Sequence, residues 1–421
     1  MARDDLIVHV VTTRAARMRA WPLLLLGILA GHAYGQSVDV HGYIDFRAVA
    51  GNDKEQSWID GGMGKERFGG DASAHHASGA LKVSFQLAPE WLASTQWQYQ
   101  PDARHRFGLL DASLRFRPVS TTPWRWSARV GVFFPPISLE NDNVGWTSPW
   151  TLSPSAINTW VGEELRTVGA EMRVEHRGQA QTLELFGAVF GKNDPAGELL
   201  AARGWALGDA TSGFNATLRE PDVYASIIGT TAPVLYRPFV EIDNRIGWYA
   251  GASWNAPAFG KVSLLRYDNR ADPSLYKEYA GRDVFAWHTR FWSLGMQSDA
   301  GEFALRGQAM HGYTAIQPEQ GLLLDTEFNA AYVLVAWTHG HWQPALRFDV
   351  FQSRQSPEPA AALHSEHGNA ATLAVNWRPQ DNLRITGEWM RVDSSRNQRL
   401  LAGLLPHQID NTLQLSVRLQ F

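Results

Sequence analysis

The feature that most constrains this chain is strict alternation between apolar and polar residues in its last ten positions. One parity of the run is apolar and the other is polar, the two sets being Leu413, Leu415, Val417, Leu419 and Phe421 against Thr412, Gln414, Ser416, Arg418 and Gln420. Successive side chains of a β-strand point to opposite faces, so the run predicts a strand with one apolar face. Similar runs recur along the chain. After the apolar stretch 21–30, no segment is apolar enough for a membrane-spanning helix.

We expect about sixteen such strands, at 38–50, 78–88, 91–100, 107–117, 124–134, 165–176, 180–190, 246–255, 261–269, 284–298, 302–310, 329–338, 342–351, 369–378, 383–393 and 410–421. Tight links, such as the one at 299–301, alternate with long connections at 51–77, 135–163, 191–245, 270–283, 311–328, 352–368 and 394–409; only 101–106 breaks this order. Backbone polar groups in lipid must be paired within the protein. The sequence therefore predicts an all-β fold: a single antiparallel transmembrane β-barrel over residues 36–421, with short periplasmic turns and long extracellular loops.

Residues 1–35 are typical of a secretory signal peptide. The apolar stretch 21–30 is too short to span a bilayer, arginines precede it, and Ala33 and Gly35 supply the small residues that a signal peptidase reads. We expect cleavage before Gln36, and Met18 as an alternative start that would make residues 1–17 an extension. Export of a barrel predicts the outer membrane of a Gram-negative cell.

The polar parity of each strand should face the lumen, and its charges lean positive. The basic candidates are Arg47, Lys82, Arg115, Arg117, Arg125, Arg129, Arg173, Arg266, Arg290, Arg306, Arg347, Arg378, Arg384 and Arg418. The acidic candidates are Asp39, Asp45, Asp111, Glu171, Glu175, Glu184, Asp268, Asp349 and Glu388. Charged rings set ion preference in pores, so this wall predicts a weak preference for anions.

Many aromatic residues share parity with the apolar faces, as a lipid-facing girdle requires. They are Trp91, Trp97, Tyr99, Phe116, Trp124, Trp126, Trp248, Trp254, Phe285, Trp287, Trp377 and Trp389.

Segment 135–163 is the third long-side connection, rich in aromatic residues and free of Lys and Arg until Arg166. Long ordered loops are usually functional. Two readings stay open for its carboxylates: solvated loop residues, or one side of a constriction.

Over its whole mature length the chain resembles the Gram-negative outer-membrane porins. The run His41-Gly42-Tyr43-Ile44-Asp45-Phe46-Arg47 is similar to their opening strand, and 155–165 looks like a feature of a poorly characterised porin-like group. Similarity to the phosphate-selective porins is partial, because their constriction is rich in Lys or Arg and this loop is acidic. The terminal Phe421, with Leu419 and Val417, resembles the signal by which the barrel assembly machinery recognises its clients.

The resemblance implies passive diffusion of small hydrophilic solutes or ions, a homotrimer, and contact with outer-membrane lipid and lipopolysaccharide. It also implies that the third loop folds inward as a constriction. The expected pore residues are then Glu140, Asp142, Glu163 and Glu164, facing Arg115, Arg125, Arg129 and Arg173.

Two other classes remain as alternatives: a barrel hydrolase and a plugged structural or adhesion barrel. A hydrolase needs a nucleophile beside a histidine, and no Gly-x-Ser-x-Gly elbow accompanies the histidines. No Gly-rich phosphate-binding motif precedes a helix, because we expect no helix in the mature chain. We therefore expect no enzymatic activity, no catalytic residue, no cofactor, no metal and no nucleic-acid partner.

Overall fold

The computed structural model describes residues 37–51, 55–69, 74–279, 281–357 and 362–421. The expected signal peptide, its cleavage site and the alternative start at Met18 lie outside the described residues.

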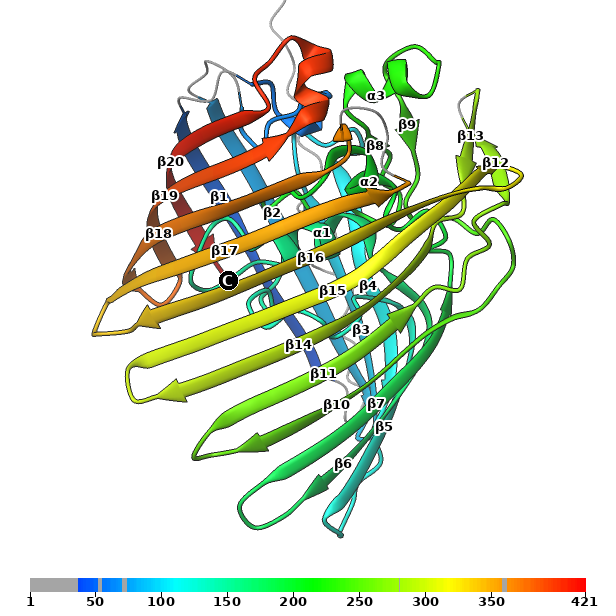
Figure 1. Cartoon of the computed structure of the whole chain (residues 1–421). Coiled ribbons are helices and arrows are strands. Elements are labelled where there is room, and N and C mark those ends of the chain that lie inside the picture. The colour runs from blue at the N-terminus through cyan, green and yellow to red at the C-terminus, as the bar shows by residue number, and fades with distance from the viewer. Residues whose placement is uncertain (1–36, 52–54, 70–73, 280, 358–361) are drawn as a thin grey trace, which may run out of the picture.

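Sixteen antiparallel strands form one closed barrel, which confirms the predicted fold and strand number (Figure 1). In barrel order the strands are β1 (Ser37–Gly51), β2 (Ala74–Ala88), β3 (Trp91–Tyr99), β4 (Phe107–Phe116), β5 (Trp124–Phe133), β6 (Thr167–Arg177), β7 (Thr182–Gly191), β10 (Gly247–Ala256), β11 (Gly260–Asp268), β14 (His288–Ala300), β15 (Phe303–Glu319), β16 (Leu322–Trp337), β17 (Trp342–Ser356), β18 (Glu366–Gln380), β19 (Leu383–Arg396) and β20 (His407–Gln420).

The long connections carry the remaining elements. They are η2 (Trp58–Asp60), α1 (Ala156–Glu164), α2 (Glu198–Arg203), β8 (Leu218–Arg219), α3 (Asp222–Ile227), β9 (Leu235–Tyr236), β12 (Tyr276–Tyr279), β13 (Arg282–Phe285) and η4 (Asn397–Ala402). The expectation of no helix was therefore wrong for these short segments. Within the described residues, none of the helices is long and apolar enough to cross a membrane.

The ends of the wall meet where β1 pairs with β20, Ile44 lying opposite Leu419. Phe421 continues this pairing, because its carbonyl accepts from Gly42 N at 2.9 Å and its N–H donates to Gly42 O at 3.0 Å. Closure leaves no open edge in the described barrel sheet.

The predicted loop at 311–328 is wrong. Strands β15 and β16 continue through it, pairing Ile316 with Leu324 and, after a register shift, Glu319 with Leu322. The sequence there loses its apolar alternation because the strands extend beyond the apolar band, so their outward side chains become polar.

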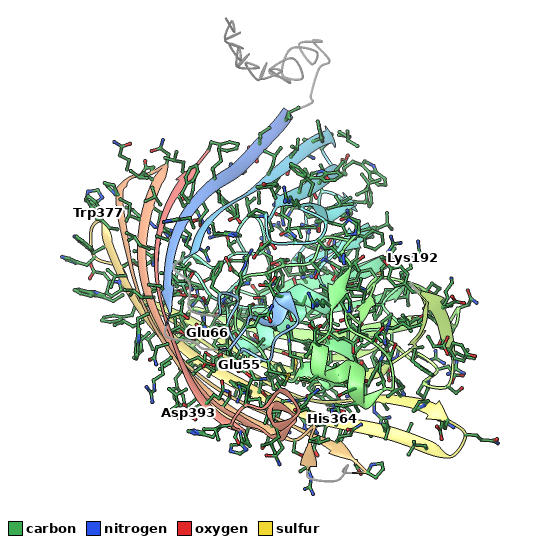
Figure 2. All side chains as sticks on the ribbon, turned by 90° about the horizontal axis from the view of Figure 1, so that it is seen from above. Glu55, Glu66, Lys192, His364, Trp377 and Asp393 are labelled. Atoms are coloured by element: carbon green, nitrogen blue, oxygen red, sulfur yellow. The ribbon has the colours of Figure 1, made fainter. Side chains whose placement is uncertain are left out.

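The outer face carries a continuous apolar band. Leu413, Leu415 and Leu419 are about half exposed on it, as the alternation predicted. Aromatic side chains stack at the end with short turns, with ring centroids 5.8 Å apart for Trp342 and Trp377, and Trp377 projects from the outer wall in Figure 2. Trp287 departs from the predicted girdle, because it is 3% exposed beneath the long loops.

On the neighbouring strands β11 and β14, the alternation assigned side chains to the wrong face of the barrel. Arg266 and Arg290 were expected in the lumen, but their strands bury Leu265, Tyr267 and Phe291 on the inner face. Asp268 shares the outward parity of Arg266. The inner face is apolar here because the loops pack an aromatic cluster against it. Without these three residues, basic groups still outnumber acidic ones on the lumen side.

Candidate pore and its loop insertion

The third long connection folds into a compact segment after β5 ends. Pro135 and Pro136 stop the strand because proline lacks the N–H that a ladder needs. Hydroxyl groups then make successive turns: Ser138 accepts from Asn141 N at 2.8 Å, and Ser148 accepts from Trp150 N at 3.1 Å. Ser155 is the N-cap of α1 and accepts from Asn158 N at 3.3 Å.

Inward side chains of distant strands hold this segment inside the barrel. Arg347 of β17 donates to Ser153 O and, at 3.0 Å, to Pro154 O. Asn376 of β18 donates to Trp150 O at 2.8 Å, and Glu388 of β19 accepts from Ser153 N at 3.0 Å. Buried loop backbone needs such partners, so the wall supplies what a sheet would otherwise supply.

An aromatic cluster completes the contact between the loop and the wall. The Trp160 ring of α1 lies 5.1 Å from Phe328 and 5.5 Å from Phe291, measured between centroids, and both phenylalanines point inward from the wall. Trp205, from the next long connection, stands edge-on to Trp160 at 6.0 Å. All four side chains are at most 1% exposed. Part of the lumen is therefore packed like a protein interior.

Connection 192–246 and the first loop also enter the barrel, where Figure 2 shows Glu55 and Glu66 inside the ring of strands. Asp209 bridges Arg47 of β1 and Arg67 of the first loop, at 2.8 Å each. Burial favours a raised pKa, but the two arginines hold the pKa of Asp209 well below its usual range. Lys65 forms a buried ion pair with Glu366 of β18. Three connections thus interlock from one end of the barrel.

The predicted constriction acids do not face the predicted arginines. Glu140 is fully buried, accepts from Ser155 N at 2.6 Å and lies 3.6 Å from Arg347. Glu163 pairs with Arg203, and its pKa is raised to about 7 by burial against the opposing effect of that arginine.

The remaining predicted acids differ from each other. Glu164 accepts from Trp160 Nε1 and Tyr236 Oη at 2.7 Å each. A buried carboxylate needs donors at contact distance, and the loops themselves supply them. Asp142 alone of the four acids is exposed.

The predicted arginines lie together on β4, β5 and β6, where two of the four bind acids of their own wall. Arg129 is 3.1 Å from Glu171, and Arg173 is 2.7 Å from Glu171 and 3.2 Å from Glu184. Arg115 and Arg125 make no ion pair with a described carboxylate, and neither does Lys82 of β2. The sequence did not single out Arg347, Asn376, Glu388 and Asp209 as loop anchors, although Arg347 and Glu388 stood among the lumen candidates.

Open space remains in the lumen beside this wall. A cavity of about 170 Å³ borders Phe134 and is also lined by Lys82, Gln96, Asp111, Arg115 and Arg129 among others. Lys82 and Arg115 are exposed, in contrast to the buried arginines of β17, β19 and β20. The lumen therefore has a packed side and a wet side.

Comparison with known proteins agrees with this architecture. Residues 304–421 match the family model described as phosphate-selective porin O and P. The outer-membrane channel DcaP of Acinetobacter baumannii superposes with a TM-score of 0.54 at 11% identity, over 92% of this chain and 98% of that one. The chain has the fold of an outer-membrane porin.

Other porin-fold structures agree. OmpF of Salmonella typhi, solved in complex with daunomycin, gives a TM-score of 0.54 at 9% identity, over 92% of this chain and 98% of OmpF. OmpT of Vibrio cholerae gives 0.50 at 8% identity, over 93% and 99%. No curated protein matches this chain in sequence. At these identities the likeness concerns the porin fold alone.

Proposed function

We propose that this outer-membrane porin passes small hydrophilic solutes by diffusion along the wet side of its lumen. The observation that carries the proposal is the cavity beside β2–β5, whose walls are polar and charged while the opposite side is filled by loops. A sixteen-stranded barrel is wide enough to hold both an inserted loop and an aqueous path. Segment 135–163 then acts as the constriction element, and Asp142 and the arginines of β4–β6 are its pore residues.

The path should prefer anions weakly. Lys82, Arg115 and Arg125 form no ion pair with a described carboxylate, although Asp111 lines the same cavity, whereas Arg129 and Arg173 share Glu171. Unpaired charge near a water-filled path acts through the field that a passing ion feels. The match of residues 304–421 to the phosphate-selective porin model is compatible with a preference for anions.

A plugged barrel is the second candidate, favoured by the Trp160 cluster and the buried anchors. Liposome swelling with sugars of rising size, combined with conductance across a planar bilayer, separates the two. Graded permeation and an anion-directed reversal potential in a salt gradient support the porin. Absence of both supports the plug, and cation selectivity overturns the anion preference.

The remaining assignments rest on the sequence and the family likeness. We propose export through the cleaved signal peptide, recognition of Phe421 by the barrel assembly machinery, a homotrimer, contact with outer-membrane lipid and lipopolysaccharide, and no enzymatic activity. Crosslinking in native membranes that yields only monomer would overturn the trimer.

A further inference from the structure

A cavity of about 490 Å³ lies at the long-loop end of the barrel, on the packed side of the lumen. Its walls come from α2, α3, β13 and the extended ends of β15 and β16, which Figure 1 shows gathered at one end of the barrel. A cavity of this volume can hold a small molecule. None of the described residues that line it also lines the cavity on the wet side, so the two spaces are separate.

The buried part of the cavity wall is apolar and aromatic. Ala201, Trp287 and Ile316 form a buried cluster, and Phe285 and Leu324 pack against it. All five residues line the cavity. The indole and phenyl rings offer faces against which a flat apolar group can pack. The apolar body of a ligand would therefore meet a preformed surface.

The charge of the cavity wall is negative. Three carboxylates line the cavity among the described residues, those of Glu198, Asp283 and Glu319. One guanidinium of the described lining, that of Arg282, opposes them. Glu198 is 3% exposed, whereas Asp283 and Glu319 are exposed, so carboxylates lie both in the depth of the cavity and at its opening. The wall therefore favours a positively charged ligand.

Two buried carboxylates already share this guanidinium. Arg282 Nη2 pairs with Glu198 and lies 2.8 Å from Glu220 Oε1, while Glu198 Oε2 and Glu220 Oε2 accept no hydrogen bond from the described residues. Burial and Glu198 raise the pKa of Glu220 well above its usual range, because one cation does not offset two buried carboxylates. Burial and Arg396 lower the pKa of His364, which also lines the cavity, to about 4. His364 is therefore neutral near pH 7, and a second cation would have to come from a ligand.

We propose that this cavity, named the vestibule cavity and defined by Glu198, Trp287 and Ile316, binds a small organic cation with an apolar body. The ammonium group lies beside the Glu198 carboxylate, and the faces of the aromatic rings attract the same charge. The apolar body packs against the Trp287 cluster. An anion would meet three carboxylates and a guanidinium that is already bound. The proposal concerns the packed side and does not depend on conduction along the wet side.

Occupancy of the vestibule cavity should also hold the third loop in place. Helix α2, which carries Glu198, is bound to α1: Leu199 N donates to Glu164 Oε1 at 3.0 Å, and Arg203 pairs with Glu163. A ligand that binds only the docked form of α2 stabilises that form by mass action. The cation should therefore slow proteolysis of connection 192–246 without entering the wet path.

The test uses the full-length barrel in mild detergent, titrated at pH 7 with 2-phenylethylammonium in a calorimeter and corrected for empty micelles. The neutral 2-phenylethanol and the anionic 3-phenylpropanoate keep the apolar body and change the charge. We expect one saturable site per chain for the ammonium, about tenfold weaker binding of the alcohol and no measurable binding of the carboxylate.

Variants locate the site. Glu198→Gln should weaken binding of the ammonium about tenfold and leave binding of the alcohol unchanged. Glu278→Gln, which changes an exposed carboxylate of β12 outside the cavity, is the matched control and should bind as the parent does. If Glu198→Gln fails to fold, as judged by heat-modifiability, the exposed pair Asp283→Asn/Glu319→Gln decides, with an expected loss of about threefold.

Several results would overturn the proposal. They are equal affinity for the three probes, tighter binding of the carboxylate, a response that does not saturate, or unchanged binding of the ammonium in Glu198→Gln. Slower cleavage of connection 192–246 with the ammonium, and not with the alcohol, supports the proposal. Conductance that falls when the ammonium is added would place the site on the conducting path and overturn its assignment to the packed side.

Discussion

The two halves of the barrel wall use the same residue type in opposite ways. On β17–β20 the inward arginines Arg347, Arg384 and Arg418 are at most 2% exposed and bind loop backbone or buried acids. On β4 and β5, Arg115 and Arg129 line the open cavity of the lumen. The difference teaches that an arginine pointing into a barrel can be a structural anchor or a pore charge, and that what the loops cover decides between them.

The largest expected effect comes from breaking an anchor. Arg347→Ala leaves Asp349 and Glu140 buried beside each other without their cation, so it should cost about 3–5 kcal/mol of stability. The loop should loosen and single-channel conductance should rise. Arg115→Ala is the matched control and should change the free energy of unfolding by no more than about 0.5 kcal/mol. Equal destabilisation by the two variants, measured by urea unfolding in lipid, would erase the contrast between the walls.

A smaller effect is expected from a neutral anchor. Asn376→Ala leaves Trp150 O without its donor inside the packed side, which should cost about 1–3 kcal/mol. Gln96→Ala, on the wet wall, should hardly change the free energy of unfolding measured in urea. A silent Asn376→Ala would mean that the loop backbone finds water there, and that this side is wetter than its packing implies.

Charge reversal on the wet wall tests whether its cations act on passing ions. Lys82→Glu/Arg115→Glu should move the reversal potential toward cation preference. The expected size is up to about 1 kcal/mol per charge, or about fivefold in permeability ratio. The reversed charges face water, so stability should hardly change. An unaltered reversal potential would place the conducting path elsewhere.

The smallest expected effect is a pH dependence of the loop stability on the packed side of the lumen. Burial and the nearby Glu241 and Asp243 raise the pKa of Asp194 in connection 192–246 to about 7, above the value near 4 of an unfolded chain. The folded loop thus binds a proton more tightly than the unfolded one. Its stability should be greater at pH 5.5 and decline as pH rises toward 8.

Limited proteolysis of connection 192–246 in reconstituted barrels measures this. Cleavage should be slower at pH 5.5 than at pH 8, with a smaller difference in Asp194→Asn. Conductance along the wet wall should not follow the same titration. Faster cleavage at pH 5.5 than at pH 8 would contradict the predicted direction of the pH dependence.

Alternation located all sixteen strands because lipid imposes it on every outward residue. It misassigned Arg266 and Arg290 because an inward face packed against an inserted loop is as apolar as an outward one. The contacts of Glu140 and Glu163 were not predictable either. Which cation a loop carboxylate meets depends on how three connections fold together, and residue spacing carries no record of that packing.

The anchors of the third loop also bear on the order in which the protein can assemble. Arg347, Asn376 and Glu388 lie 194, 226 and 235 residues further along the chain than the loop backbone they bind at Ser153, Trp150 and Ser153. Contacts so distant in sequence form late, because their closure entropy is large. Until β17–β19 arrive, the backbone of Trp150, Ser153 and Pro154 lacks these partners. A barrel stalled before these strands would present that backbone to water and proteases, so docking of the loop marks a wall that is nearly complete.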